Sequence, residues 1–244
     1  MPNWVWNDLT IEGNPVQVSL LKDKLNSPFT VPVEVMGMGD INPHGFPTKF
    51  KEVTYNKPVF AFWNIINPYE HGITADEYAQ QPSRSELEPN DPNWWADVQA
   101  KQKVGKSWYD WNITNWGTKW DIAVSDNEKY PDTELYDEEE NGDNLVLVYK
   151  FQTAWSPAIP VFIKLSEQYP ELLLTLEYEE EGGWGGEIEF LRGKVNSESS
   201  YDEKCYECDA VNCFDYCEEC DCNVCSACGN NREEDKCTHE RAEA

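Results

Sequence analysis

WVWNDLTIEGNPVQVSLLKDKL, residues 4–25, predicts a strand, a tight turn and a helix in succession. Val5, Leu9 and Ile11 alternate with polar residues, and this period of two is typical of a half-buried strand. Asn14 then predicts a helix N-cap, with Pro15 at the first helical position. The apolar residues expected on the buried face of this helix are Val18, Leu21 and Leu25.

The periodicity of apolar residues and the positions of capping residues also predict further strands and helices along the body of the chain. Further strands are expected at residues 58–66, 120–124, 145–154, 172–178 and 184–191. Further helices are expected after the capping residues Thr74 and Ser156, and over a segment that carries Trp108, Trp111, Asn112 and Asn115 on one face and ends at Gly117. Residues 27–58 are expected to be largely irregular, and residues 125–144 to form an acidic, hairpin-like loop. This order of strands and helices along the chain predicts an α+β fold with helices packed on one face of a sheet.

All nine cysteines lie between Cys205 and Cys237, so a body without thiols precedes a thiol-rich tail. Several pairs in the tail have C-x-x-C spacing, which lets two thiolates of a short turn bind one tetrahedral ion. A tail this short cannot bury enough apolar surface to fold alone, so bound metal is expected to supply its folding free energy. The sequence therefore predicts an α+β domain at 1–195, a linker at 196–204 and a small zinc-binding module at 205–240.

The tail offers enough ligands for two tetrahedral zinc sites, that is, for about two zinc ions per chain. The candidates are Cys205, Cys208, Cys213, Cys217, Cys220, Cys222, Cys225, Cys228, Cys237 and His239. The preferred first site contains Cys205, Cys208, Cys225 and Cys228. The preferred second site contains Cys217, Cys220, Cys237 and His239. Cys213 and Cys222 are then unassigned, and either of them can replace another ligand.

Two alternatives to structural zinc stay open. Cys222, Cys225 and Cys228 form part of a bacterial iron–sulfur run, but the fourth cysteine and its proline are missing at the expected place. Disulfides need an oxidising compartment, whereas the N-terminal sequence has no basic start, apolar run or cleavage site of an export signal. An odd number of cysteines would also leave one thiol unpaired. Structural zinc is therefore expected in preference to an iron–sulfur cluster or to disulfides.

The chain is strongly acidic, with 46 Asp and Glu against 19 Lys and Arg, a net charge of −27 and a pI near 4.3. Such a field repels phosphate backbones, so direct nucleic-acid binding is disfavoured. The charge is expected mainly to solvate the surface, or alternatively to imitate nucleic acid or bind a basic partner. No apolar run approaches the roughly 18 residues of a membrane span, so no membrane association is expected.

The string NWGTKWD, residues 115–121, has two interpretations. In the favoured one, Trp111, Trp116 and Trp120 fill the core, and Gly117 has a positive φ. In the other, polar residues of this region line a binding pocket with aromatic walls. The candidate binding residues are Asn112, Asn115, Lys119 and Asp121.

Recognisable catalytic motifs are missing from the body. It contains no cysteine, and His44 and His71 lie in loop segments without metal-ligand spacing. Neither a P-loop nor a complete dinucleotide fingerprint occurs. Ser156, which precedes Pro157, is interpreted as a helix N-cap and not as a nucleophile. No catalytic residue is therefore assigned.

The body also carries five distinctive strings: MPNWVWNDLTIEG, FWNIINP, WYDWNITNWGTKWD, FQTAWSPAIP and LEYEEEGGWGGEIEF. With these strings, residues 1–193 resemble the YubB-like family of phage and plasmid proteins. The resemblance implies a ferredoxin-like α+β domain, a name that refers to topology and not to an iron–sulfur cluster. It also implies a mobile-element origin and hence a bacterial cytoplasm. It implies no reaction, and the cysteine tail is outside the usual pattern of the family.

These features predict a non-enzymatic phage- or plasmid-type accessory protein that binds a macromolecular partner, expected to be a host protein. One alternative is an acidic mimic of nucleic acid that blocks a DNA-binding protein. Another is a carbohydrate-active enzyme with a tryptophan-rich face lined by carboxylates such as Asp110 and Asp121.

Overall fold

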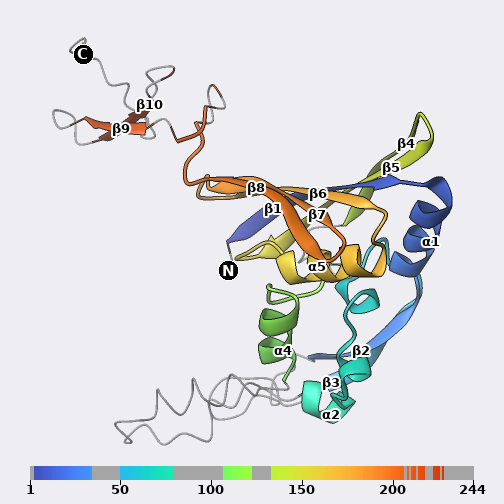
Figure 1. Ribbon diagram of the computed structural model, residues 1–244. Coiled ribbons are helices and arrows are strands. Elements are labelled where there is room, and N and C mark those ends of the chain that lie inside the picture. The colour runs from blue at the N-terminus through green and yellow to red at the C-terminus, as the bar shows by residue number, and fades with distance from the viewer. Residues whose placement is uncertain are drawn as a thin grey trace, which may run out of the picture.

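The computed structural model describes residues 3–34, 50–79, 107–122 and 133–205, together with 208, 210–212, 214–217, 222–225 and 227. A six-stranded antiparallel sheet with strand order β4-β5-β1-β6-β7-β8 forms the centre of the body (Figure 1). Its strands are β1 (Trp4–Gly13), β4 (Glu134–Asn141), β5 (Asn144–Ala154), β6 (Leu173–Glu180), β7 (Gly185–Leu191) and β8 (Lys194–Tyr201).

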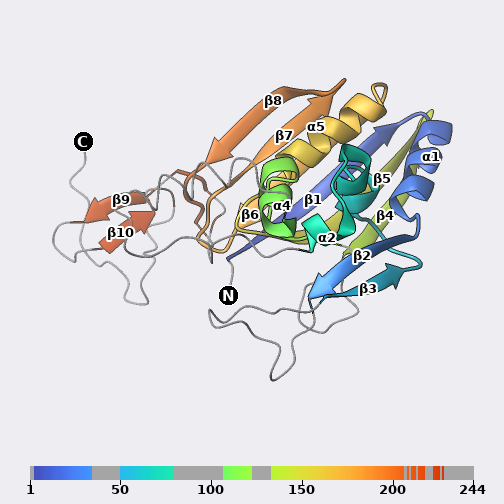
Figure 2. The same cartoon turned by 90° about the horizontal axis from the view of Figure 1, so that it is seen from below.

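Two helices and four of these strands have a ferredoxin-like arrangement. Helix α1 (Pro15–Leu25) follows β1, and helix α5 (Ile159–Gln168) joins β5 to β6. The chain order β1-α1-β4-β5-α5-β6 is the βαββαβ order of that fold. Strands β7 and β8 extend the sheet beyond β6. The helices lie on one side of the sheet, as Figures 1 and 2 show. The expected α+β class is confirmed.

The strand–turn–helix unit at the N-terminus has the predicted form. Asn14 Oδ1 accepts a hydrogen bond from Val16 N at 3.0 Å, and Pro15 begins the helix. Val18, Leu21 and Leu25 have no exposed surface. Because each buried aliphatic side chain stabilises the fold by about 1.5–3 kcal/mol, this apolar stripe fixes α1 against the sheet.

Residues 58–66, expected to form a strand, are mostly irregular and contain the 3-10 helix η1 (Phe62–Asn64). Phe60 and Phe62 are fully buried, so the apolar run correctly indicated burial. A continuous apolar run does not distinguish a buried strand from another buried segment. The deciding contact is distant in sequence: the carboxylate of Asp121 accepts hydrogen bonds from Phe62 N and Trp63 N at 2.8 and 2.9 Å.

Other expectations about strands need correction. Strands β2 (Phe29–Glu34) and β3 (Phe50–Tyr55) pair with each other in a segment expected to be irregular. Residues 120–122 form no strand, and residues 123–124 lie outside the described part of the chain. The acidic segment expected to be a loop contains β4, which pairs with β5 despite its run of glutamates.

The expected linker at 196–204 is wrong for most of its length, because β8 occupies Lys194–Tyr201. Arg192 and Gly193 connect β7 to β8 with φ values of 54° and 74°. Two positive φ angles are characteristic of the two-residue turn that suits the twist of a hairpin. Polar side chains along β8 gave it the composition of a linker, while backbone pairing with β7 makes it a strand.

Most predictions around the other helices are confirmed. Helix α2 (Ala75–Tyr78) has the capping box of Thr74, and Gly117 follows α4 (Trp108–Asn115) with a φ of 78°. Ser156 is a correction, because Ala158 occupies the N-cap of α5 and the hydroxyl of Ser156 donates to Gly117 O at 2.5 Å. Over the described residues, none of the helices has the length and hydropathy needed to cross a membrane.

Candidate metal centre

The first two cysteines of the tail lie in a tight turn that follows β8. Lys204 forms an isolated antiparallel bridge with Val211, and Cys205 N donates to Ala210 O at 2.9 Å. These contacts close the chain on itself around Cys208. A closed turn of this kind brings the two cysteines of a C-x-x-C pair to one side, as a tetrahedral ion requires.

Asn212 closes the turn with both its backbone and its side chain. Its N–H donates to Glu203 O at 2.8 Å, and its Oδ1 accepts from Asp202 N at 2.9 Å. Its φ is 49°, a left-handed conformation that asparagine tolerates better than most residues. These local hydrogen bonds define the turn without any contribution from a metal ion.

The third cysteine is brought to this turn by a two-stranded hairpin. Strands β9 (Phe214–Cys217) and β10 (Cys222–Cys225) pair in antiparallel register, with Cys222 opposite Cys217. Cys225 is the last residue of β10 and is fully buried, while Cys205 is 2% exposed and Cys208 is exposed. The hairpin thus carries Cys225 back to a pair that precedes it by nearly twenty residues.

The sulfur atoms of Cys205, Cys208 and Cys225 all lie within 4.8 Å of one another. Cys208 Sγ and Cys225 Sγ are 3.7 Å apart. A zinc ion with Zn–S distances of about 2.3 Å has tetrahedral sulfur–sulfur edges of about 3.8 Å. A disulfide has an S–S distance of about 2.05 Å, so the spacing of this pair suits ligands of one ion and not a covalent bond.

These residues are three members of the first ligand set expected from the sequence, and the fourth, Cys228, lies outside the described residues. Soft thiolate ligands select zinc or iron over calcium or magnesium. The arrangement can therefore hold one thiophilic ion, and the identity of that ion stays a prediction. For the second expected site, only Cys217 is placed. Cys213, Cys220, Cys237 and His239 lie outside the described residues.

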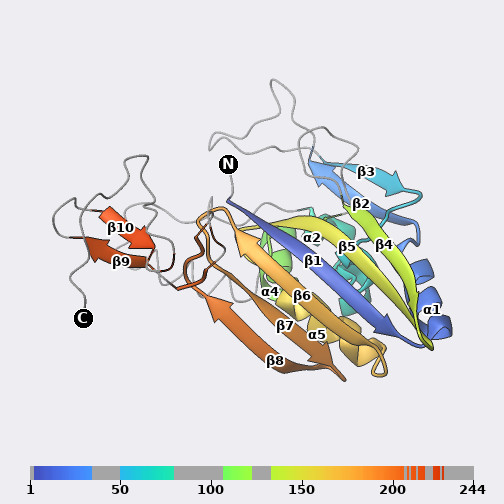
Figure 3. The same ribbon diagram turned by 90° about the horizontal axis from the view of Figure 1, so that it is seen from above.

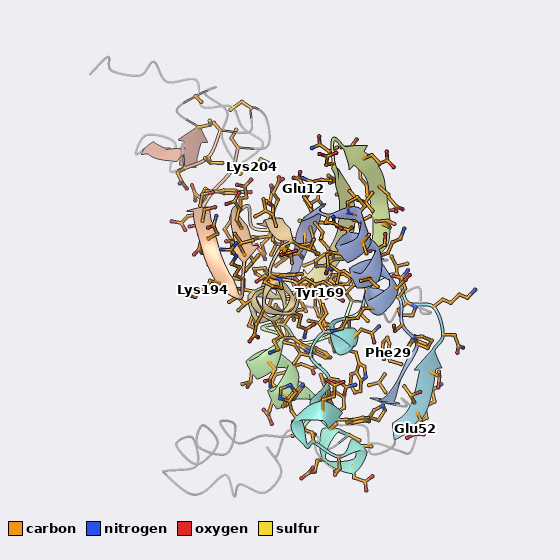
Figure 4. The ribbon with its side chains drawn as sticks, turned by 45° about the vertical axis from the view of Figure 1, so that its right-hand side comes forward. Glu12, Phe29, Glu52, Tyr169, Lys194 and Lys204 are labelled. Carbon is orange, nitrogen blue, oxygen red and sulfur yellow. The ribbon has the colours of Figure 1, made fainter. Side chains whose placement is uncertain are left out.

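The candidate metal centre is connected to the sheet by a polar contact that the sequence did not reveal. Glu179 on β6 accepts hydrogen bonds from Lys204 Nζ at 2.9 Å and from Tyr201 Oη at 3.1 Å. Partial burial, and then the charge of Glu179, raises the pKa of Tyr201 to about 12. Lys204 lies at the junction of β8 and the tail (Figure 4). The residue adjacent to Cys205 is thereby anchored to the body.

Among the candidate binding residues of the body, the two asparagines have structural roles. Asn112 is 3% exposed, accepts from Tyr78 Oη at 2.9 Å and donates to Lys119 O at 2.9 Å. Asn115 donates to Trp111 O at 2.9 Å within the same helix. The core interpretation is right for Trp111 and Trp116, which are 8% and 1% exposed. It is wrong for Trp120, which is only partly buried.

Asp121 also has a structural role, because its carboxylate accepts hydrogen bonds from backbone N–H groups. Besides capping η1, it accepts from Ile122 N at 2.7 Å. Asp110, the other carboxylate considered for catalysis, is buried and accepts from Ser107 Oγ at 2.8 Å, and burial raises its pKa. Both carboxylates are thus accounted for by contacts within the fold.

Lys119 is the one candidate that lies among aromatic side chains at the surface. Its ammonium is 4.3 Å from the ring centroid of Trp120 and 5.1 Å from that of Trp155. Trp108 and Tyr109 lie slightly farther away, at 5.9 and 5.8 Å. Trp155 is 45% exposed. A ligand role for Lys119 stays a prediction.

A match to a protein-family model supports the ferredoxin-like topology. Residues 119–221 match the family model described as "Ferredoxin-like domain in Api92-like protein". The match covers less than half of the chain and reaches into the cysteine-rich tail. The crystal structure of a protein api92 from Yersinia pseudotuberculosis is similar over 84% of this chain and 100% of that one, with 12% identity and a TM-score of 0.41. A search of curated proteins found no match.

Proposed function

We propose that the tail is a structural zinc module appended to the ferredoxin-like domain of a non-enzymatic accessory protein. The observation that carries the zinc proposal is the convergence of Cys205, Cys208 and Cys225 within 4.8 Å. Cys228 completes the site, because its C-x-x-C spacing from Cys225 repeats that of Cys205 and Cys208. Four thiolates leave no open position for a substrate, so the ion stabilises the fold and does not catalyse a reaction.

Zinc would provide the energy that this part of the chain otherwise lacks. Structural zinc contributes about 10–16 kcal/mol of apparent binding free energy in small zinc modules, and this is available for folding. The described tail supports this proposal, because its only named secondary structure is the short β9–β10 pair in addition to one isolated bridge. Such a pair is marginally stable by itself in water.

The proposed partner is a basic region of a host protein, which binds the uncovered face of the sheet. No helix covers this face in the described part of the chain (Figure 3). Asp8, Glu177 and Glu187 are successive cross-strand neighbours on β1, β6 and β7. Adjacent like charges destabilise a sheet, so a cationic partner would relieve their repulsion. Lys150 Nζ, 3.1 Å from Asp8 Oδ2, offsets only one end of this row.

The sequence resemblance supports the finer assignment to the YubB-like family and to a phage or plasmid origin. A bacterial cytoplasm is the compartment that fits this origin, and it keeps thiols reduced as zinc binding requires. The match to a ferredoxin-like family model supports the fold on which this assignment rests.

Affinity capture from bacterial lysate, followed by mass spectrometry, tests the partner. The bait is the zinc-loaded chain. The charge variant is Asp8→Asn/Glu177→Gln/Glu187→Gln, and Glu139→Gln/Glu140→Gln, which removes two negative charges from β4, is the acidic control. The proposal expects a basic protein that the wild type and the control retain and the charge variant loses. Capture of a DNA-binding protein that duplex DNA displaces would favour the mimic. Turnover of a small molecule without any captured protein would contradict the proposal.

A further inference from the structure

Trp6 is an exposed tryptophan on the uncovered face of the sheet. It lies in β1 between Val5 and Asn7, which are both buried, whereas Trp6 is 45% exposed. Successive residues of a strand point to opposite faces, so Trp6 points away from the core that contains Val5. Figure 3 shows the face opposite to that core, which carries no helix in the described part of the chain. Large aromatic side chains are typical anchors of protein interfaces.

Carboxylates adjoin Trp6 on the same face. Asp8 follows it by two positions in β1, and Glu179 is directly opposite it on β6. Glu177, which is exposed, is opposite Asp8 and thus diagonal to Trp6. Diagonal neighbours of an antiparallel pair are about 7–8 Å apart, which is within reach of long side chains. A cationic side chain placed over the indole would therefore also reach a carboxylate.

Glu177 is the carboxylate best placed to pair with such a cation. Glu179 already accepts a hydrogen bond from Lys204, and Asp8 Oδ2 lies 3.1 Å from Lys150 Nζ. A planar guanidinium can stack on an indole and donate two hydrogen bonds to one carboxylate, whereas the ammonium of lysine is a strongly hydrated point charge. The combination of an exposed indole and a diagonal carboxylate thus favours arginine.

We infer that Trp6 is the anchor of the proposed interface and gives it a preference for arginine over lysine. This inference rests on the proposed function, because the occupant is a basic segment of the partner protein. The charge of the face determines this choice of occupant. A second copy of the chain would bring its own acidic row against Asp8, Glu177 and Glu187, and nucleic acid would bring phosphates. The acidic row attracts the basic segment, and Trp6 distinguishes between the two kinds of basic side chain.

Fluorescence anisotropy of labelled peptides tests the inference with the full, zinc-loaded chain at physiological ionic strength. Two peptides of equal length and charge carry either arginine or lysine at every basic position, with glycine elsewhere. Trp6→Leu keeps an apolar side chain without an aromatic face, and Trp6→Tyr keeps an aromatic face. Trp155→Ala is the matched control, because Trp155 is also 45% exposed, but its ring centroid lies 5.1 Å from the ammonium of Lys119, which would repel an arginine.

We expect the arginine peptide to bind the wild type about five- to tenfold more tightly than the lysine peptide. Trp6→Leu should abolish this ratio of affinities, Trp6→Tyr and Trp155→Ala should retain most of it, and the charge variant described above should bind both peptides more weakly. Equal affinities of the two peptides for the wild type, or an unchanged ratio in Trp6→Leu, would overturn the inference and leave the proposal of a basic partner intact. A ratio lost equally in Trp6→Leu and Trp6→Tyr would also overturn it. A wild type that binds neither peptide would contradict the proposed basic partner as well.

Discussion

Replacing Trp116 by alanine tests whether the NWGTKWD string belongs to the core or to a binding surface. Trp116 is 1% exposed, and its ring packs near those of Phe62 and Trp63, with centroids 6.0 and 6.4 Å away. Its Nε1 donates to Ile66 O at 3.0 Å. The side chain therefore joins the segment after α4 to the irregular apolar segment around η1.

The expected magnitude follows from these contacts. Removing a buried tryptophan to alanine typically costs about 3–5 kcal/mol, because the cavity relaxes only partly. Trp116→Phe retains much of the packing and leaves Ile66 O without this donor, which costs about 1–3 kcal/mol. The matched control is Trp155→Ala, since Trp155 is 45% exposed. Its cost should not exceed about 1 kcal/mol, as is usual for surface positions.

Urea unfolding followed by far-UV circular dichroism measures these differences without depending on the fluorescence of the other tryptophans. The free energies come from the midpoints and slopes of the transitions. The predicted order of stability is wild type and Trp155→Ala, then Trp116→Phe, then Trp116→Ala. Equal midpoints for Trp116→Ala and Trp155→Ala would refute a core role for Trp116.

Three further outcomes are expected. Asp121→Ala should cost about 2–3 kcal/mol in the same unfolding assay, because it leaves backbone donors of η1 without their acceptor; a variant as stable as the wild type would contradict the cap. Burial raises the folded-state pKa of Asp110 above its unfolded value, so the contribution of this group favours folding at low pH and is lost as pH rises through the folded pKa. Asp110→Asn should therefore gain stability relative to the wild type as pH rises from about 4 to 7, and a constant difference in thermal melts across this range would contradict the shift. Chelation should accelerate amide hydrogen exchange in the tail and leave β1 and β5 protected; equal acceleration in both parts would show that metal also supports the body.

Sequence patterns were most informative where local chemistry decides the structure. The N-cap at Asn14, the capping box at Thr74 and the positive φ at Gly117 were all predicted, because each depends on a few adjacent residues. The alternation in β1 and β5 was equally clear, since one face of each strand is buried. Long-range contacts decided the failures. Asp121 is distant in sequence from the η1 backbone that it caps.

The candidate metal centre shows the same difference between features set by local residues and features set by long-range contacts. C-x-x-C spacing indicated Cys205 and Cys208 because their turn is local, yet identical spacing between Cys222 and Cys225 corresponds to a strand. Spacing alone does not distinguish the two cases, whereas strand register does. No sequence pattern indicated that Glu179 forms an ion pair with Lys204, because glutamate is so frequent in this sequence.

The zinc content of the full chain, together with the zinc K-edge absorption spectrum, tests the central claim most directly. The account predicts bound zinc with sulfur neighbours at about 2.3 Å, and the loss of one ion in both Cys205→Ala and Cys225→Ala. Protein that contains no zinc after purification under reducing conditions, or zinc whose amount is unchanged in both variants, would contradict it.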